Sequence, residues 1–138
     1  MNRHALIVSS VVIIAFVGFF AFRRAQAPVP PTNDSVRVSM PVSGASVISP
    51  LSVSGEARGT WFFEASFPLV VLDSERREIA QSHAQANGEW MTEDFVQFSG
   101  TVEFIAPASD TGYIVFKKDN PSGDSARDAS VEIPVRFR

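Results

Sequence analysis

Residues 61–73, WFFEASFPLVVLD, decide the fold of this chain. Every second position from 61 to 71 is apolar: Trp61, Phe63, Ala65, Phe67, Leu69 and Val71. The alternate positions are mixed in the first half of the stretch and become apolar towards its end. A period of two over this length is typical of a β-strand with one face in a hydrophobic core. The sequence therefore predicts one central strand over the whole stretch.

Shorter strand signals lie on both sides of this central strand. Apolar runs separated by Gly, Pro, Asn and Asp predict strands over 36–40, 47–48, 51–55, 78–84, 96–104, 112–118 and 131–137. No stretch after residue 24 has the 3.6-residue period of a helix. Seven or eight short strands predict an all-β fold, an immunoglobulin-like antiparallel β-sandwich spanning 36–138.

The N-terminus carries a different signal. Residues 5–22 are uncharged and predominantly apolar, and as a helix they would measure about 27 Å, close to the thickness of a bilayer core. The alternative is a cleaved signal peptide with its small-x-small site at 25–27. Arg23 and Arg24 stand between the apolar run and that site and argue against cleavage. We therefore expect residues 1–24 to form one transmembrane anchor.

A Pro-rich segment at 25–35 follows the predicted anchor. Pro28, Pro30 and Pro31 favour an extended polyproline conformation. We expect this segment to be a linker that holds the domain up to about 30 Å from the membrane.

Composition excludes several functional classes. Three of the 12 basic residues lie in the first 24 positions and all 15 acidic residues come later, so the remainder carries a net charge of −6. An acidic domain without a basic patch repels a phosphate backbone, so no nucleic-acid partner is expected. The chain has no cysteine, which excludes disulfides, thiolate metal sites and a cysteine nucleophile.

The sequence offers no catalytic set. His83 is the only histidine beyond the predicted anchor, and no Gly-x-Ser-x-Gly motif is present. Glu64 and Asp94 are the only pair of carboxylates that we considered for glycoside hydrolysis, and a small sandwich offers them no obvious cleft. We expect a protein that is not an enzyme and needs no cofactor, with a small envelope hydrolase as the remotest alternative.

One loop region is rich in oxygen ligands. Asp119, Asp124 and Asp128 lie close in sequence, together with Asn120. Calcium binds such oxygen atoms, although the spacing is not that of an EF-hand. We favour solvated turn residues here, and a calcium-stabilised structural spacer without a ligand remains an alternative function.

Three segments distinguish this chain from a generic β-sandwich sequence. WFFEASFP at 61–68, GEWMTEDFVQF at 88–98 and KKDNPSG at 117–123 resemble the immunoglobulin-like domain of bacterial spore germination proteins, over about residues 36–138. The resemblance implies a secreted or membrane-anchored module of the cell envelope. On this basis we expect a single-pass cell-membrane protein whose C-terminal domain is extracytoplasmic. Its partner would be an envelope protein or a wall polymer.

Residues of these segments form the candidate partner-binding surface: Phe62, Glu64, Asp94, Asn120 and Ser122. An exposed Phe62 would suit binding, although a loop of the same domain is the more expected cover for its ring. Glu64 either faces solvent or accepts hydrogen bonds from the 120–122 turn, and we favour the hydrogen bonds. Trp90, Met91 and Phe95 are expected at one end of the core.

Overall fold

The computed structural model describes residues 33–138, which form eight β-strands and two 3-10 turns. The strands are β1 (Val36–Met40), β2 (Ala45–Val47), β3 (Leu51–Arg58), β4 (Ser66–Asp73), β5 (Glu78–Ala86), β6 (Phe95–Val102), β7 (Thr111–Lys117) and β8 (Ser130–Phe137). The 3-10 turns are η1 (Gly59–Trp61) and η2 (Ser125–Arg127). The predicted all-β class and strand number are confirmed.

The predicted anchor at 1–24, and the linker up to residue 32, lie outside the described residues. Within residues 33–138 there is no helix long and apolar enough to cross a membrane.

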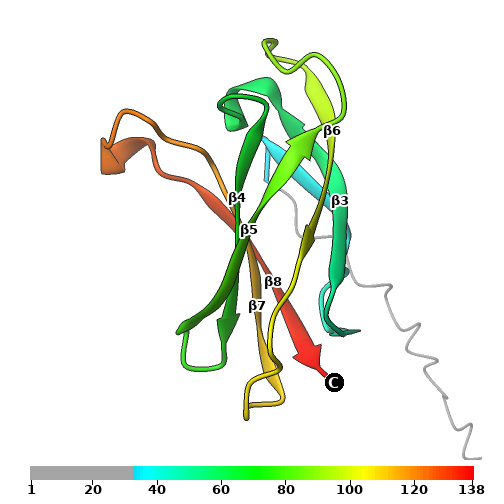
Figure 1. The fold of residues 1–138 in the computed structure, drawn as a ribbon. Coiled ribbons are helices and arrows are strands. Elements are labelled where there is room, and N and C mark those ends of the chain that lie inside the picture. The colour runs from blue at the N-terminus through cyan, green and yellow to red at the C-terminus, as the bar shows by residue number, and fades with distance from the viewer. Residues whose placement is uncertain (1–32) are drawn as a thin grey trace, which may run out of the picture.

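The strands form two layers that face each other across the core (Figure 1). Hydrogen bonding joins them in the order β1-β3-β6-β5-β4-β7-β8-β2, and neighbours are antiparallel except for the parallel pair β2 and β8. Strands β1, β3 and β6 make one layer, and β4, β7, β8 and β2 make the other. This is the layered arrangement expected of a β-sandwich.

Strand β5 belongs to both layers. It pairs with β4 from Ser66 to Leu72, and its last three residues, 84–86, also pair with β6. One lateral side of the sandwich is therefore closed by a continuous strand. Where β5 passes from one layer to the other, its backbone lies close to that of β6 at Gly100. An added Cβ at Gly100 would lie 2.9 Å from the carbonyl oxygen of His83.

The other lateral side is divided between the two shortest strands. β1 edges one layer with five residues and β2 edges the other with three, and the chain passes between them through Pro41. A proline offers no backbone N–H to a neighbouring strand. Neither layer therefore ends in a long strand with a free row of hydrogen-bonding groups.

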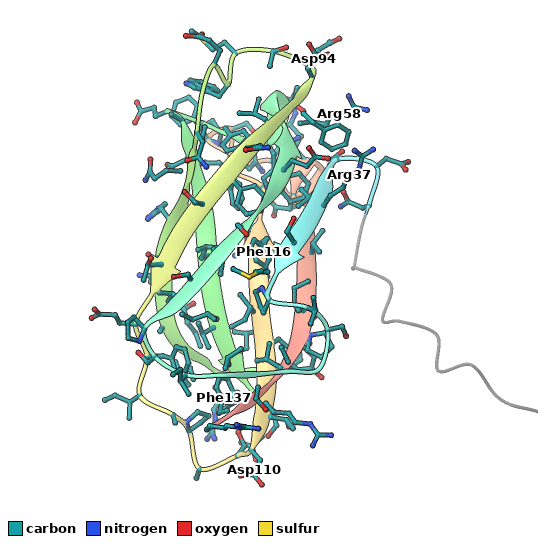
Figure 2. All side chains as sticks on the ribbon, turned by 90° about the vertical axis from the view of Figure 1, so that its right-hand side faces the viewer. Arg37, Arg58, Asp94, Asp110, Phe116 and Phe137 are labelled. Carbon is teal, nitrogen blue, oxygen red and sulfur yellow. The ribbon has the colours of Figure 1, made fainter. Side chains whose placement is uncertain are left out.

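The core is built around aromatic rings. Phe67 of β4, Phe98 of β6 and Phe116 of β7 are at most 1% exposed, and their ring centroids lie 4.9–6.5 Å apart. Figure 2 shows Phe116 in the interior between the layers. Phe104 and Phe137 form a second aromatic pair in the core, with ring centroids 5.4 Å apart.

The predicted central strand is shorter than expected. β4 begins at Ser66, because Glu64 and Ala65 both have positive φ angles, of 50° and 63°, and make a two-residue turn closed by reciprocal backbone hydrogen bonds between Phe63 and Ser66. The predicted alternation holds from Phe67 to Val71, whose inward positions are fully buried. Before the turn it fails, since Phe63 is exposed.

The connecting loops gather at two ends of the sandwich. The "loop end" consists of residues 59–65, 87–94 and 118–129, which connect β3 to β4, β5 to β6 and β7 to β8. The chain also enters there, because the Arg58 N–H donates to the Ser35 carbonyl. The "opposite end" consists of 48–50, 74–77 and 103–110, and the C-terminus lies there (Figure 1).

Candidate functional site

The loop end gathers the three sequence segments that set this chain apart from a generic sandwich. Backbone hydrogen bonds fix them to one another: the Gly59 N–H donates to Asp94, the Ala86 N–H to Ala65 and the Asp119 N–H to Trp61, over 2.8–3.1 Å. The loops at the top of Figure 1 are therefore tied to a common base, while the β7–β8 connection projects to one side.

Gly59 allows the β5–β6 loop to lie directly on η1. A Cβ at this position would overlap the backbone carbonyl oxygens of Trp90 and Thr92. The absence of a side chain thus brings the backbone at 90–92 against the turn at 59–61. This contact sets the position of Met91.

Two large apolar side chains are exposed at this end. Met91 is 77% exposed and Phe63 is 42% exposed, whereas Trp90 is partly buried against the core. A recess of about 360 Å³ lies here, lined by Gly59, Thr60, Phe62, Trp90, Met91, Thr92 and Glu93. The prediction that Met91 packs into the core is wrong: the loop turns its side chain outward.

Four carboxylates occupy the same two loops. Glu64 is carried by the turn before β4, and Glu89, Glu93 and Asp94 by the β5–β6 loop; all four are exposed. None of them makes an ion pair with any residue in the part of the chain that the structure describes. Of the four, Glu93 lines the recess and the other three lie on the same two loops, so this end of the domain carries exposed negative charge that is not paired within the described residues.

The nearest arginines are held by other groups. Arg37 and Arg58 each place the guanidinium carbon 4.0 Å from the centroid of the Phe95 ring. Arg37 also pairs with Glu56 at 2.7 Å, and Arg58 donates to the backbone carbonyl of Glu93 at 3.3 Å. Figure 2 shows both arginines below Asp94. Phe95 is thus half-buried under two cations. The prediction that it packs into one end of the core is wrong.

The structure places Phe62 inside the domain. It is 5% exposed and its ring lies 5.2 Å from that of Phe67. The favoured prediction, that Phe62 is covered by its own domain, is confirmed, and the alternative of an exposed Phe62 that binds a partner is wrong; the neighbouring Phe63 is the ring that faces solvent. Sequence alternation missed Phe63 because the two-residue turn at Glu64 and Ala65 shifts the phase between Phe63 and strand β4.

The favoured prediction for Glu64, that it accepts hydrogen bonds from the 120–122 turn, is wrong. Its carboxylate is exposed, and no hydrogen bond links it to the 120–122 turn among the described residues. Because the positive-φ turn leaves it exposed, the carboxylate needs no hydrogen-bond partner within the protein.

Asn120 organises its own loop instead. Its side-chain amide donates to the Asp124 carbonyl at 2.8 Å and to the Asp128 carboxylate at 2.7 Å, and its oxygen accepts from the Ser122 hydroxyl at 2.6 Å. Asp124 caps η2 through the Ala126 N–H at 3.0 Å. Asn120 and Ser122 are therefore structural residues of this loop.

The calcium candidates do not assemble into a site. Asp119, Asp124 and Asp128 are not brought together, and residues 33–138 contain no group of three or more His, Cys, Asp or Glu side chains placed to hold a metal ion. The carboxylates of Asp124 and Asp128 already accept hydrogen bonds from the loop.

The catalytic candidates are not joined into a hydrogen-bonded set within the described residues. His83 is exposed on β5 and makes no side-chain hydrogen bond within the described range, so no nucleophile is paired with it. Asp94 is exposed in the β5–β6 loop and Glu64 in the turn before β4, and neither side chain lines the recess.

The strongest charged network lies at the opposite end. Asp73, only 4% exposed, accepts hydrogen bonds at 2.9 Å from the Glu75 N–H, the Arg77 N–H and the Arg77 side chain. The backbone N–H of Arg77 is the main cause that lowers the pKa of Asp73, and burial opposes it. The same carboxylate raises the pKa of Arg77. This network secures the β4–β5 turn and is remote from the recess.

Comparison with known proteins gives one match. Residues 35–125 match the family described as the immunoglobulin-like domain of bacterial spore germination. This range contains all three segments from which the resemblance was inferred, so that inference is confirmed. No curated protein and no solved structure matches the chain.

Proposed function

The chain belongs to the immunoglobulin-like domain family of bacterial spore germination, and we propose that it is a non-enzymatic binding module tethered to the membrane of the bacterial cell envelope. The family is one of immunoglobulin-like domains, not of known enzymes. In this proposal the loop end is the surface that meets the partner, which is an envelope protein or a wall polymer.

Met91, which is 77% exposed, carries the proposal. It projects from the β5–β6 loop and lines the recess, and Phe63, before the turn into β4, is a second exposed apolar side chain of the same end. A large apolar side chain held outward beside a recess is a candidate contact for a partner. The close approach at Gly59 and the three interloop hydrogen bonds hold this surface in place before binding, which lowers the entropy cost of association.

The tether is proposed from the sequence of residues 5–22 and from the position of Asn33. The described chain starts at the loop end, with the Asn33 side chain capping the backbone of Ser35 and Val36 at 2.8 and 2.7 Å. The predicted linker over 25–35 would therefore attach to the domain at the same end as the proposed binding surface. This arrangement keeps the partner near the membrane.

Site-specific photo-cross-linking tests the binding surface. The full chain would carry p-benzoylphenylalanine in place of Met91, expressed in the bacterium that encodes it. The matched control places the same residue at Ile105, which is 90% exposed at the opposite end. We expect one discrete adduct from position 91 and none from position 105. Equal labelling from both positions, or none from position 91, contradicts the proposal.

Membrane extraction tests the tether separately. We expect the full chain to sediment with membranes and to resist alkaline carbonate, as an integral protein does. Release into the aqueous fraction would refute the tether and leave the binding surface to be judged by the cross-linking result.

A further inference from the structure

We infer that the loop end recognises a protein segment in which an apolar side chain is flanked by Lys or Arg. This inference rests on the proposed function and specifies the partner's chemistry. It follows from two separate properties of the same surface, its recess and its uncompensated charge.

The recess determines the central group of the partner. Its lining includes Phe62, Trp90 and Met91, so its walls are largely apolar, and its volume of about 360 Å³ is at the small end of typical ligand pockets. A single Leu, Met or Phe side chain suits such a recess. Thioether groups such as that of Met91 adapt readily to the shape of an inserted side chain.

The charges determine the flanking groups. Glu93 lines the recess, Asp94 follows it, and Glu64 and Glu89 lie on the two loops that border it. None of the ion pairs of the described residues involves these four carboxylates; the pairs are Arg37–Glu56, Arg76–Glu132, Arg77–Asp73, Arg77–Glu75 and, in the β7–β8 loop of the same end, Arg127–Asp124. A partner with cations on both sides of its apolar group would supply the missing counter-ions and associate faster at low salt.

The same charges decide between the two classes of partner. Wall polymers that carry phosphate groups would be repelled by the four carboxylates, as nucleic acids would be. Arg58, whose guanidinium lies on the Phe95 ring and donates to the Glu93 carbonyl, brings one positive charge to this loop and so offsets only part of the four negative charges. The surface therefore favours a cationic protein segment over an anionic polymer.

Methionine methyl NMR on the full chain in nanodiscs of neutral lipid tests this inference. The chain has three methionines, and Met40, which is 52% exposed on β1, is a control within the same sample. The probes are the peptides Gly-Lys-Leu-Lys-Gly, Gly-Glu-Leu-Glu-Gly and Gly-Lys-Ser-Lys-Gly. We expect the first to shift the Met91 signal and leave Met40 unchanged. Its affinity should be roughly tenfold or more above those of the other two.

Charge-neutral variants provide the second arm. Glu64→Gln, Glu93→Gln and Asp94→Asn combined should weaken binding of the Lys-Leu-Lys peptide roughly tenfold and remove its dependence on salt. These groups are exposed and unpaired among residues 33–138, so the fold is expected to survive. The control combines Glu103→Gln with Asp110→Asn, two exposed carboxylates of the opposite end, and should bind as the parent does.

Three results would overturn the inference. They are equal binding of the Glu-Leu-Glu peptide, unchanged affinity in the neutral variant, and a phosphate-bearing teichoic acid that shifts Met91 at lower concentration than any peptide. If position 91 still yields a discrete cross-link in cells, the proposed function stands and only the partner's chemistry is wrong. If that cross-link is also absent, both proposals fail.

Discussion

Phe67 and Phe98 meet edge to face, with ring centroids 4.9 Å apart and an interplanar angle of 80°. The two rings come from β4 and β6, which lie in different layers, so their contact joins the two halves of the core. Edge-to-face aromatic pairs add roughly 0.5–1.5 kcal/mol beyond the burial of their area.

Removing one ring should therefore weaken the whole domain. We expect Phe98→Ala to lower the free energy of unfolding by about 3–5 kcal/mol, measured by chemical denaturation. Phe63→Ala is the matched control, because Phe63 is 42% exposed, and it should change stability by no more than about 0.5 kcal/mol. Similar losses in the two variants would contradict the two-layer core.

The turn before β4 offers a stabilising substitution. Ala65 has a φ of 63°, a conformation that costs a non-glycine residue about 1–2 kcal/mol. Ala65→Gly should raise the free energy of unfolding by about 1 kcal/mol, because the relief exceeds the added chain entropy. Ala86→Gly, within strand β5, should lower it by a similar amount. A loss of stability in Ala65→Gly would argue against this turn.

Gly59 should be intolerant of a side chain. A methyl group there overlaps the carbonyl oxygens of Trp90 and Thr92, so Gly59→Ala must displace the β5–β6 loop. We expect a loss of about 1–3 kcal/mol in thermal or chemical unfolding, together with a changed methyl signal of Met91. Gly88→Ala is the control, because Gly88 lies in the β5–β6 loop and an added Cβ there would have no atom within 4 Å. It should leave the stability and the Met91 signal unchanged.

Stability should fall in acid through Asp73. Its pKa is lowered in the folded protein, chiefly by the backbone N–H of Arg77, from an unfolded value of about 3.9. Its contribution is therefore fully present above the unfolded pKa and is lost as the pH falls through the folded pKa. Asp73→Asn should destabilise the domain at pH 7, and the difference from the parent should shrink as the solution becomes acidic.

Denaturation of both proteins from pH 7 down to pH 2 measures this difference. Asp110→Asn, at an exposed position of the same end, is the control and should follow the parent throughout. A gap between Asp73→Asn and the parent that stays constant with pH would show that the carboxylate charge does not contribute.

Periodicity was a reliable guide wherever one face of a strand packs on the core. The buried positions of β4, β6 and β8 alternate with exposed or half-buried ones over most of their length, and these strands were predicted near their observed positions. The same reasoning could not place the start of β4. Glu64 and Ala65 are not residues that usually mark a left-handed turn, so nothing local showed that the alternation ends there.

The candidate site was predicted by region, but not by residue. The segments at 61–68 and 88–98 do form the loop end, yet Phe62 is buried while Phe63 and Met91 are exposed. Which of three adjacent aromatics faces solvent depends on the η1 turn, whose position depends on Gly59 and on the distant loop at 90–92. Such long-range contacts leave no periodic trace in the sequence.

The divided lateral side described above also limits how these molecules can associate. With five residues in β1, three in β2 and Pro41 between them, neither edge can serve as a template for an added strand of useful length. Many copies at high density on a membrane would thus remain separate domains and would not pair edge to edge into extended β-sheets. The proposed contact through the loop end does not depend on strand addition, so substitutions there could alter specificity without disturbing the sheets.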